Sequence, residues 1–166
     1  MAGLSVFAQS EAFETERKFT GSLLSRVYDG PTIGVNFENA TKAGTYIAYV
    51  GAINVNVHDT SLYGNGFVLG VGRKFYLKKN ENYRWNIQNA VEYAQYNFSE
   101  SDYTGTYRYI SFVTPQLGYK FKLGNFAIEP AIGFLWKIEI KGKGDVDNNS
   151  FFNTKGKYGL NVGYMF

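Results

Sequence analysis

The chain contains no cysteine, only three prolines and a single histidine. The absence of cysteine excludes a disulfide framework and any thiolate metal site. A single histidine leaves almost no room for a zinc or iron site, because such sites take several ligands. A membrane helix is also excluded, since the longest apolar run, Tyr46 to Ile53, is far shorter than the ~18 residues that a spanning helix needs.

Strong charge of either sign is missing as well. The net charge is +3 over 166 residues, and no basic cluster is interleaved with aromatic residues, so nucleic acid is not an expected partner. The length fits one domain. Tyrosine, phenylalanine and glycine are abundant, with 14, 14 and 19 copies. The chain is therefore either soluble or crosses a membrane as strands, whose alternation escapes hydropathy averaging.

Period-two alternation of apolar and polar residues covers nearly all of the sequence after Lys18 and predicts strands. The eight expected strands are 18–28, 31–38, 44–57, 65–77, 83–98, 106–122, 126–141 and 156–166. An even number places both termini on one side, as in bacterial barrels, and most connections on that side are the shorter ones. The pattern predicts an all-β fold, an antiparallel up-and-down eight-stranded transmembrane β-barrel.

The larger apolar residues of each strand define the face expected to meet lipid. In the third strand this assignment turns Ile47, Tyr49, Ile53 and Val55 outward, and in the sixth it turns Tyr107 and Tyr109 outward. The opposite face is polar and rich in glycine. An eight-stranded barrel is too narrow for an aqueous channel, so we expect the polar side chains to fill its interior as ion pairs.

Particular interior pairs follow from the turn Gly124-Asn125, because two-residue hairpins favour Gly and Asn. This turn places Phe121 opposite Ile128 on the outer face and Lys120 opposite Glu129 on the inner face. The same scheme brings Glu92 and Lys137 together across the interior. It also turns Arg108 inward.

The last ten residues, Lys157 to Phe166, alternate large apolar with small or polar side chains and end on an aromatic residue. They resemble the C-terminal assembly signal of bacterial outer-membrane β-barrel proteins, and residues 18–166 resemble the small OmpA/OmpX-like barrels. The resemblance implies a Gram-negative outer-membrane location with periplasmic termini and no cofactor. Its implied partners are outer-membrane lipid and lipopolysaccharide, the barrel-assembly machinery through the strand ending in Phe166, and an outer-membrane protein complex.

The N-terminal residues divide into two short segments ahead of the barrel domain, 18–166. Residues 1–9 read as a signal-peptide remnant with a cut after Ala8, or as an ordinary flexible terminus. Their Ala-Gln junction resembles exported proteins of the Bacteroidota. Residues 10–17 read as a short periplasmic tail.

Several residues depart from the barrel pattern and are candidates for a lipid or partner surface. Arg73 falls on the lipid face, where it either snorkels to headgroups or binds anionic lipid. Asn89 and Ser111 are polar among lipid-facing neighbours, which indicates a partner surface or a local bulge. Phe151 and Phe152 lie in the last outer loop, where they contact a partner, fold back onto the rim or dip into the lipid interface.

His58 is the one weak candidate for catalysis. Small outer-membrane barrels include lipid A deacylases and acyltransferases that use His with Ser or an acid, but the spacing around His58 does not match the His-x-Ser pattern of the deacylases. We therefore expect a non-enzymatic barrel with a structural or binding role and no open pore. The alternatives are a lipid A-modifying enzyme, a narrow transporter of small solutes, and a soluble lipocalin-like carrier.

Overall fold

The computed structural model describes residues 19–41, 44–56, 63–77, 83–100, 103–144 and 153–166. The expected signal remnant and periplasmic tail lie outside these ranges. Within the described ranges, no helix has the length and apolar character needed to cross a membrane.

Nine strands make up the sheet. They are β1 (Phe19–Val27), β2 (Pro31–Thr41), β3 (Gly44–Asn56), β4 (Tyr63–Tyr76), β5 (Tyr83–Glu100), β6 (Tyr103–Val113), β7 (Gln116–Leu123), β8 (Phe126–Gly144) and β9 (Thr154–Met165). The strands β6 and β7 lie end to end, and each pairs with β5 on one side and with β8 on the other. Together they fill one place in the ring. The predicted eight-stranded antiparallel barrel is therefore confirmed, with its sixth strand interrupted at residues 114 and 115.

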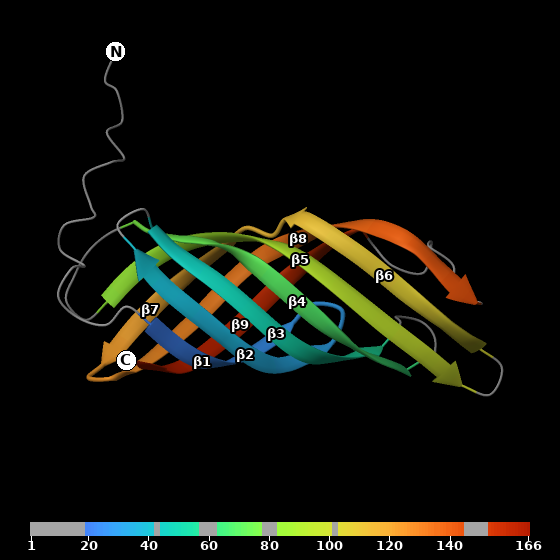
Figure 1. Cartoon of the computed structure of the whole chain (residues 1–166), viewed down its shortest axis with the longest axis horizontal. Helices are drawn as coiled ribbons and strands as arrows, with labels where there is room; N and C mark the ends of the chain where they lie inside the picture. The colour runs from blue at the N-terminus through green and yellow to red at the C-terminus, as the bar shows by residue number, and fades with distance from the viewer. Residues whose placement is uncertain (1–18, 42–43, 57–62, 78–82, 101–102, 145–152) are drawn as a thin grey trace, which may run out of the picture.

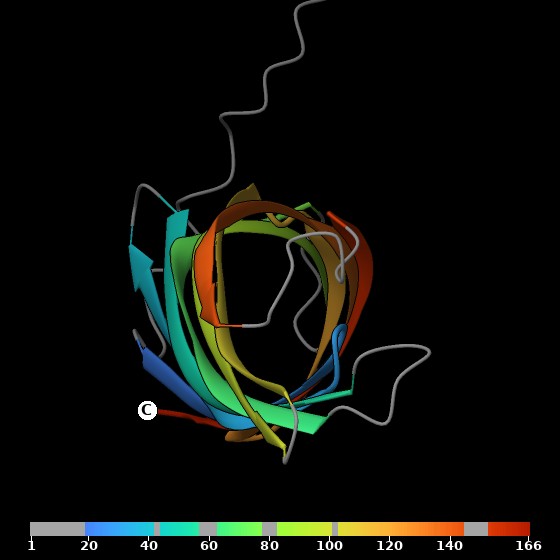
Figure 2. The same ribbon diagram turned by 90° about the vertical axis from the view of Figure 1, so that its right-hand side faces the viewer.

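The ring closes through the first and last strands. β9 pairs with β1 on one side and with β8 on the other, and β4 pairs with β5. Figure 2 shows the closed ring end-on. A closed sheet leaves no unpaired strand edge, which is the condition for strands that face lipid.

The two ends of the barrel differ. Phe166 and the turn Gly124-Asn125 lie at the left in Figure 1, and we call this the near end. At the opposite, far end, β5 and β8, with 18 and 19 residues, are the longest strands. Together with β6 they extend the wall of the far end, as Figure 1 shows. The short β1–β2 turn, residues 28–30, also belongs to the far end.

The turn between β7 and β8 has the predicted register. Gly124 has a φ of 63°, a left-handed conformation that glycine adopts without strain. Leu123 lies opposite Phe126, and Phe121 lies opposite Ile128. The turn chemistry and the alternation therefore agree, as expected from the sequence.

Apolar side chains cover the outside of the barrel. Large apolar residues with more than half of their surface exposed occur on most strands and include Leu23, Ile33, Phe37, Val71, Phe126, Ile132 and Tyr158. Polar and charged residues are buried inside, including Arg26, Glu38, Lys74, Glu92, Lys120, Glu129, Lys137 and Lys157. This distribution is the reverse of that in a water-soluble protein, in which charged residues are almost never fully buried.

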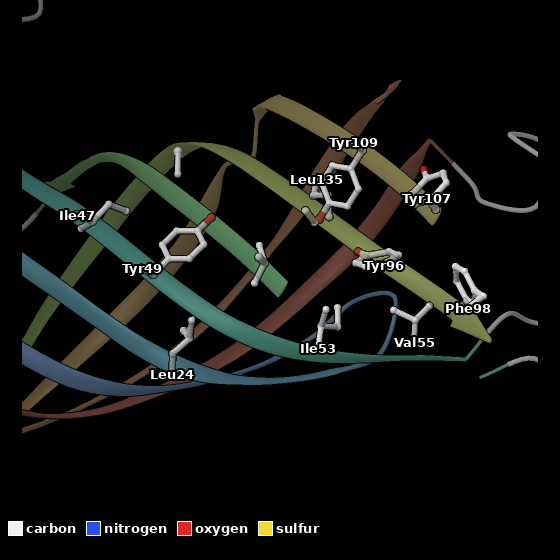
Figure 3. Packing of buried hydrophobic residues seen from close by; sticks show 13 residues of the cluster. Leu24, Ile47, Tyr49, Ile53, Val55, Tyr96, Phe98, Tyr107, Tyr109 and Leu135 are labelled. Atoms are coloured by element: carbon white, nitrogen blue, oxygen red, sulfur yellow. The ribbon is translucent and has the colours of Figure 1, made fainter. Parts of the chain in front are cut away.

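The predicted orientation of β3 is wrong. Ile47, Tyr49 and Ile53 are buried inside the barrel, whereas Tyr46 and Val50 are exposed. Both faces of this strand are apolar, so the sequence pattern does not distinguish them. Inside the barrel, Ile47, Tyr49 and Ile53 belong to a cluster of buried apolar and aromatic side chains, which Figure 3 shows.

The predicted orientation of β6 is also wrong. Tyr107 and Tyr109 have no exposed surface and point into the barrel, where they pack on Tyr96 with ring centroids 5.6 and 5.9 Å away (Figure 3). Arg108, which was expected inside, consequently faces outward. The cause is a one-residue bulge near the end of the strand, described below.

Glycine at position 70 makes room for one interior side chain. A Cβ atom at Gly70 would lie 2.1 Å from the ring of Tyr49. Tyr49 can therefore approach β4 closely only because Gly70 has no side chain.

Candidate functional site

Four charged residues form a closed cluster inside the near half of the barrel. Lys74 Nζ lies 2.5 Å from Glu38 Oε1 and 2.7 Å from Glu129 Oε1. Lys120 Nζ lies 2.6 Å from Glu38 Oε2 and 3.6 Å from Glu129 Oε2. The predicted pair of Lys120 and Glu129 is confirmed. The two lysines and two glutamates come from β4, β7, β2 and β8, so this near cluster joins walls on different sides of the interior.

A second cluster surrounds Glu92 of β5, which has no exposed surface. Its carboxylate accepts hydrogen bonds from Lys157 Nζ, from the Tyr49 hydroxyl at 2.5 Å and from the Tyr109 hydroxyl at 2.7 Å. Arg26 Nη1 lies 3.9 Å from the same carboxylate. A buried carboxylate with this many donors is fully solvated by the protein, which offsets its removal from water.

The guanidinium of Arg26 also stacks on an interior ring. Its central carbon lies 4.0 Å from the centroid of the Tyr49 ring. This contact stabilises a buried cation without a second carboxylate. The tyrosines in this central cluster therefore serve both as hydrogen-bond donors and as surfaces for cations.

A third cluster is centred on Asp29, a residue that the sequence pattern does not single out. Asp29 lies in the β1–β2 turn, yet its carboxylate is buried. It accepts hydrogen bonds from Lys137 Nζ at 3.1 and 3.0 Å and from the Tyr96 hydroxyl at 2.9 Å. The expected contact between Glu92 and Lys137 is therefore wrong, because Glu92 pairs with Lys157 and Lys137 with the turn. Aspartate is common in turns for local reasons, so its sequence position gave no signal of an inward role.

A bulge separates β6 from β7 and reverses the faces of the strand. Phe112 and Val113 are both exposed, while Ser111 and Thr114 on either side of them are buried. The register of the strand against β8 shifts between Ile110 and Val113. An extra residue of this kind interrupts the ladder and moves all later side chains to the other face.

Asn89 hydrogen-bonds to the backbone of this bulge from the neighbouring strand. Its Oδ1 accepts from the backbone N–H of Thr114 at 2.8 Å, and its Nδ2 donates to the carbonyl of Phe112 at 3.1 Å. The hydroxyl of Thr114 lies 2.9 Å from both the N–H and the carbonyl of Ala90. Side chains thus replace backbone hydrogen bonds that the bulge removes, so the backbone polar groups of the bulge keep partners within the protein.

Ser111 does not lie on the outer wall, so the expected polar stripe of Asn89 and Ser111 is wrong. Ser111 has no exposed surface, and its hydroxyl donates to the carbonyl of Trp136 at 2.5 Å. The alternative interpretation, a local bulge, accounts for both residues. Pro130 is exposed within β8 and pairs with Leu160, while Pro115 lies in the interruption between β6 and β7.

Arg73 is on the outer face of β4, as expected. Its guanidinium carbon lies 5.1 Å from the centroid of the Tyr46 ring and 5.3 Å from that of Phe75. Its Nη2 lies 3.4 Å from the position that a Cβ atom at Gly44 would occupy. The side chain therefore extends toward the near end of the barrel across two rings. Binding of a lipid or partner by Arg73 stays a prediction.

The remaining candidates, His58, Phe151 and Phe152, lie outside the described residues. Among the residues that are described, no group of three or more His, Asp or Glu side chains could hold a metal ion.

Comparisons with known proteins identify the fold. No protein-family model matches the sequence, and a search of curated proteins gives no match. Several solved structures are similar over most of the chain. The N-terminal β-barrel domain of Pseudomonas aeruginosa OprF has a TM-score of 0.63 at 13% identity and covers 91% of this chain and 99% of that one.

Two further similar structures are outer-membrane proteins or surface proteins of comparable size. Neisserial surface protein A (NspA) has a TM-score of 0.63 at 8% identity and covers 89% of this chain and 94% of that one. A major outer membrane protein from Thermus thermophilus has a TM-score of 0.57 at 12% identity, covering 89% of this chain and 99% of that one. The chain therefore has the fold of small outer-membrane β-barrel proteins.

Proposed function

We propose that the protein is an integral outer-membrane β-barrel that acts as a structural or binding protein, without catalysis and without an open pore. The observation that carries this proposal is the reversed distribution of side chains, with apolar residues exposed on the outer wall and charged residues buried inside. Burial of apolar surface is worth about 25 cal/mol per Å², so a wall of exposed Leu, Ile, Val and Phe side chains favours a lipid environment.

The interior supports a closed barrel rather than a channel. The lysines at positions 74, 137 and 157 have at most 1% of their surface exposed, and each is paired with a carboxylate. Water-filled pores keep their charged linings solvated, whereas these charges are solvated by one another. Passage of ions would require the clusters to separate.

The last strand supports a role for the barrel-assembly machinery as a partner. β9 presents Tyr158, Leu160, Val162 and Tyr164 to the outside and completes the ring against β1. In the proposed orientation the near end, where Phe166 lies, is periplasmic. Lipid and lipopolysaccharide are the other proposed partners, together with an outer-membrane protein complex.

Expression with an N-terminal secretory signal sequence, followed by membrane fractionation and gel migration, tests the proposal. We expect recovery in the outer-membrane fraction and faster SDS-gel migration of unboiled than of boiled protein, because closed barrels resist unfolding by SDS. Liposomes that contain the purified protein should not swell in small sugars or conduct ions above background. Recovery as a detergent-free soluble protein would contradict the membrane location, and a steady ion flux would contradict the closed interior.

A further inference from the structure

Charge is segregated between the two sides of the described barrel wall. The carboxylates of Asp29, Glu38, Glu92 and Glu129 are all buried in the interior, and Glu139 accepts a hydrogen bond from the inward-facing Tyr107. Among side chains that the structure describes, no carboxylate lies on the outer wall. The outer wall nevertheless carries cations, and these lie toward its two ends.

Arg73 extends toward the near end, and the other outer cations, Arg108 and Lys143, belong to the far end. Arg108 lies opposite Gln95 on β5 and Ile140 on β8. Lys143 is exposed and lies opposite Thr106. Since residues opposite each other share a face of the sheet, both cations belong to the same outer surface.

Amide and hydroxyl groups lie beside these cations. Gln95 Nε2 donates to Asn97 Oδ1 at 3.3 Å, and the hydroxyl of Thr106 donates to the same oxygen at 3.4 Å. The phenol of Tyr93 donates to Gln95 Oε1 at 3.4 Å. We call this surface the far-end outer patch; its residues are Gln95, Asn97, Thr106, Arg108 and Lys143.

The patch lies where the apolar wall ends. On the outer face of β5, Ile87, Val91 and Tyr93 are followed by Gln95 and Asn97. From Trp85 near the opposite end to Gln95, the strand rises by roughly 25 Å at about 3.3 Å per residue and a tilt of about 40°. This height matches the apolar band of outer-membrane barrels. The patch is therefore at the level of lipid headgroups.

The cations of the patch have no complementary charge in the described wall. Arg108 Nε is buried and donates to no acceptor among the described residues. A planar guanidinium binds phosphate with two parallel hydrogen bonds, and an ammonium adds a point charge. Neighbouring amides and hydroxyls donate to and accept from sugar hydroxyls.

We infer that the far-end outer patch binds the phosphorylated sugar headgroup of an outer-leaflet glycolipid. Arg108 and Lys143 bind the phosphate, and Gln95, Asn97 and Thr106 hydrogen-bond to the sugar. The inference rests on the proposed outer-membrane location, because only there does the patch meet such headgroups. It adds to that proposal the surface that holds this ligand and the role of each residue in binding it.

Binding of a phosphorylated glycolipid to the purified barrel in non-ionic detergent tests the inference. The probe is lipid A, compared with the same lipid after enzymatic removal of its phosphates, and affinity is measured by thermophoresis. Arg108→Gln combined with Lys143→Gln should weaken binding of lipid A about tenfold or more, since two charge-assisted contacts are lost. Removal of the phosphates should weaken binding to the wild-type protein by a similar factor.

Arg73→Gln is the matched control, because it removes one outer-wall cation at the other end of the barrel. The affinity of this variant for lipid A should be within about twofold of the wild-type affinity, since Arg73 is outside the patch. Equal binding by the double variant and the wild type would overturn the inference. An equally large loss with Arg73→Gln would also overturn it, because binding would then follow overall charge.

Inorganic phosphate distinguishes a headgroup from a free anion as the ligand. Millimolar phosphate should displace lipid A only weakly, because the sugar contacts are absent from the free ion. Full displacement, with lipid A binding no more tightly than phosphate, would overturn the assignment to a glycolipid. Gel migration and fractionation of the same variants show whether the barrel and its location are intact, so failure of this inference is distinguishable from failure of the proposed function.

Discussion

Asp29 and Lys137 join the turn between β1 and β2 to β8, which is separated from β1 by β9. The aspartate lies in the turn between β1 and β2, and the lysine lies on β8, with both carboxylate oxygens within 3.1 Å of Nζ. The turn is thereby held inside the far end of the barrel. Lys155 Nζ, 3.9 Å from Oδ1, adds a second, weaker attraction.

Asp29→Ala should destabilise the barrel substantially. The substitution removes the carboxylate that pairs with the buried ammonium of Lys137. Removing one partner of a buried ion pair typically lowers the free energy of unfolding by about 3–5 kcal/mol. Urea unfolding in detergent, followed by the shift in gel mobility, measures the change. The double variant Asp29→Ala with Lys137→Met should recover part of the loss, and a double variant as unstable as the sum of the two single ones would show that the pair does not interact.

Lys74→Met should destabilise the near cluster more than an exposed lysine substitution does. Glu38 and Glu129 would share Lys120 as the one remaining lysine of the cluster, and like charges held close in a low dielectric repel strongly. We expect a loss of at least about 3 kcal/mol in the same unfolding measurement. Lys143→Met on the outer wall is the control and should change stability by less than about 1 kcal/mol.

Gly70→Ala should impair folding because its Cβ atom would lie 2.1 Å from the Tyr49 ring. The ring cannot move away without breaking its hydrogen bond to Glu92. Gly21→Ala is the control, since a Cβ atom there would meet only Phe166, at 3.7 Å. The yield of refolded protein with the unboiled gel mobility should fall for the first variant and stay unchanged for the second.

Asn89→Leu should destabilise the barrel although the residue faces outward, where leucine is otherwise favourable. The substitution leaves the N–H of Thr114 and the carbonyl of Phe112 without their side-chain partners. Unpaired backbone groups facing lipid cost about 1–3 kcal/mol each. Ile87→Leu, on the same face of β5, should have almost no effect, and a gain in stability for Asn89→Leu would contradict the role assigned to Asn89.

The reversal of faces at the bulge can be tested by labelling, because the chain has no native cysteine. Cysteines placed singly at Phe112 and at Val113 should both react with a membrane-soluble maleimide in folded protein, whereas cysteines at Ser111 and Thr114 should be protected. All four variants should react after unfolding. Reaction at only one of Phe112 and Val113 would mean that the strand continues without a bulge.

The sequence predicted the orientation of most strands correctly. In β8, for example, one face is apolar and the other is polar. Phe134, Trp136 and Ile138 are exposed on the outer face, and Lys137 is buried on the inner face. Orientation failed where that contrast is missing, because β3 is apolar on both faces. The predicted orientation of β6 was also wrong, because the bulge adds one residue and reverses the faces of the strand. The alternation is regular on both sides of the bulge, so the sequence pattern does not reveal it.

The interior contacts were predictable only within a single hairpin. Lys120 and Glu129 were found from the register of the turn between β7 and β8. The pairing of Glu92 with Lys157 depends on the diameter of the closed barrel and on which long side chains reach across it, and neither is a local property. The role of Asp29 depends on a turn folding inward, which is decided by partners on distant strands.

If the barrel inserts into a membrane as proposed, its ion-pair clusters have a consequence for the order of events during insertion. Lys74 pairs with glutamates of β2 and β8, and Glu92 of β5 pairs with Lys157 of β9, so these charges are neutralised between strands that are not neighbours. A hairpin that entered lipid alone would expose bare charges to hydrocarbon. For the proposed outer-membrane location we therefore expect the chain to gather its strands into a nearly complete ring before lipid surrounds it, so that the first and last strands close early during insertion.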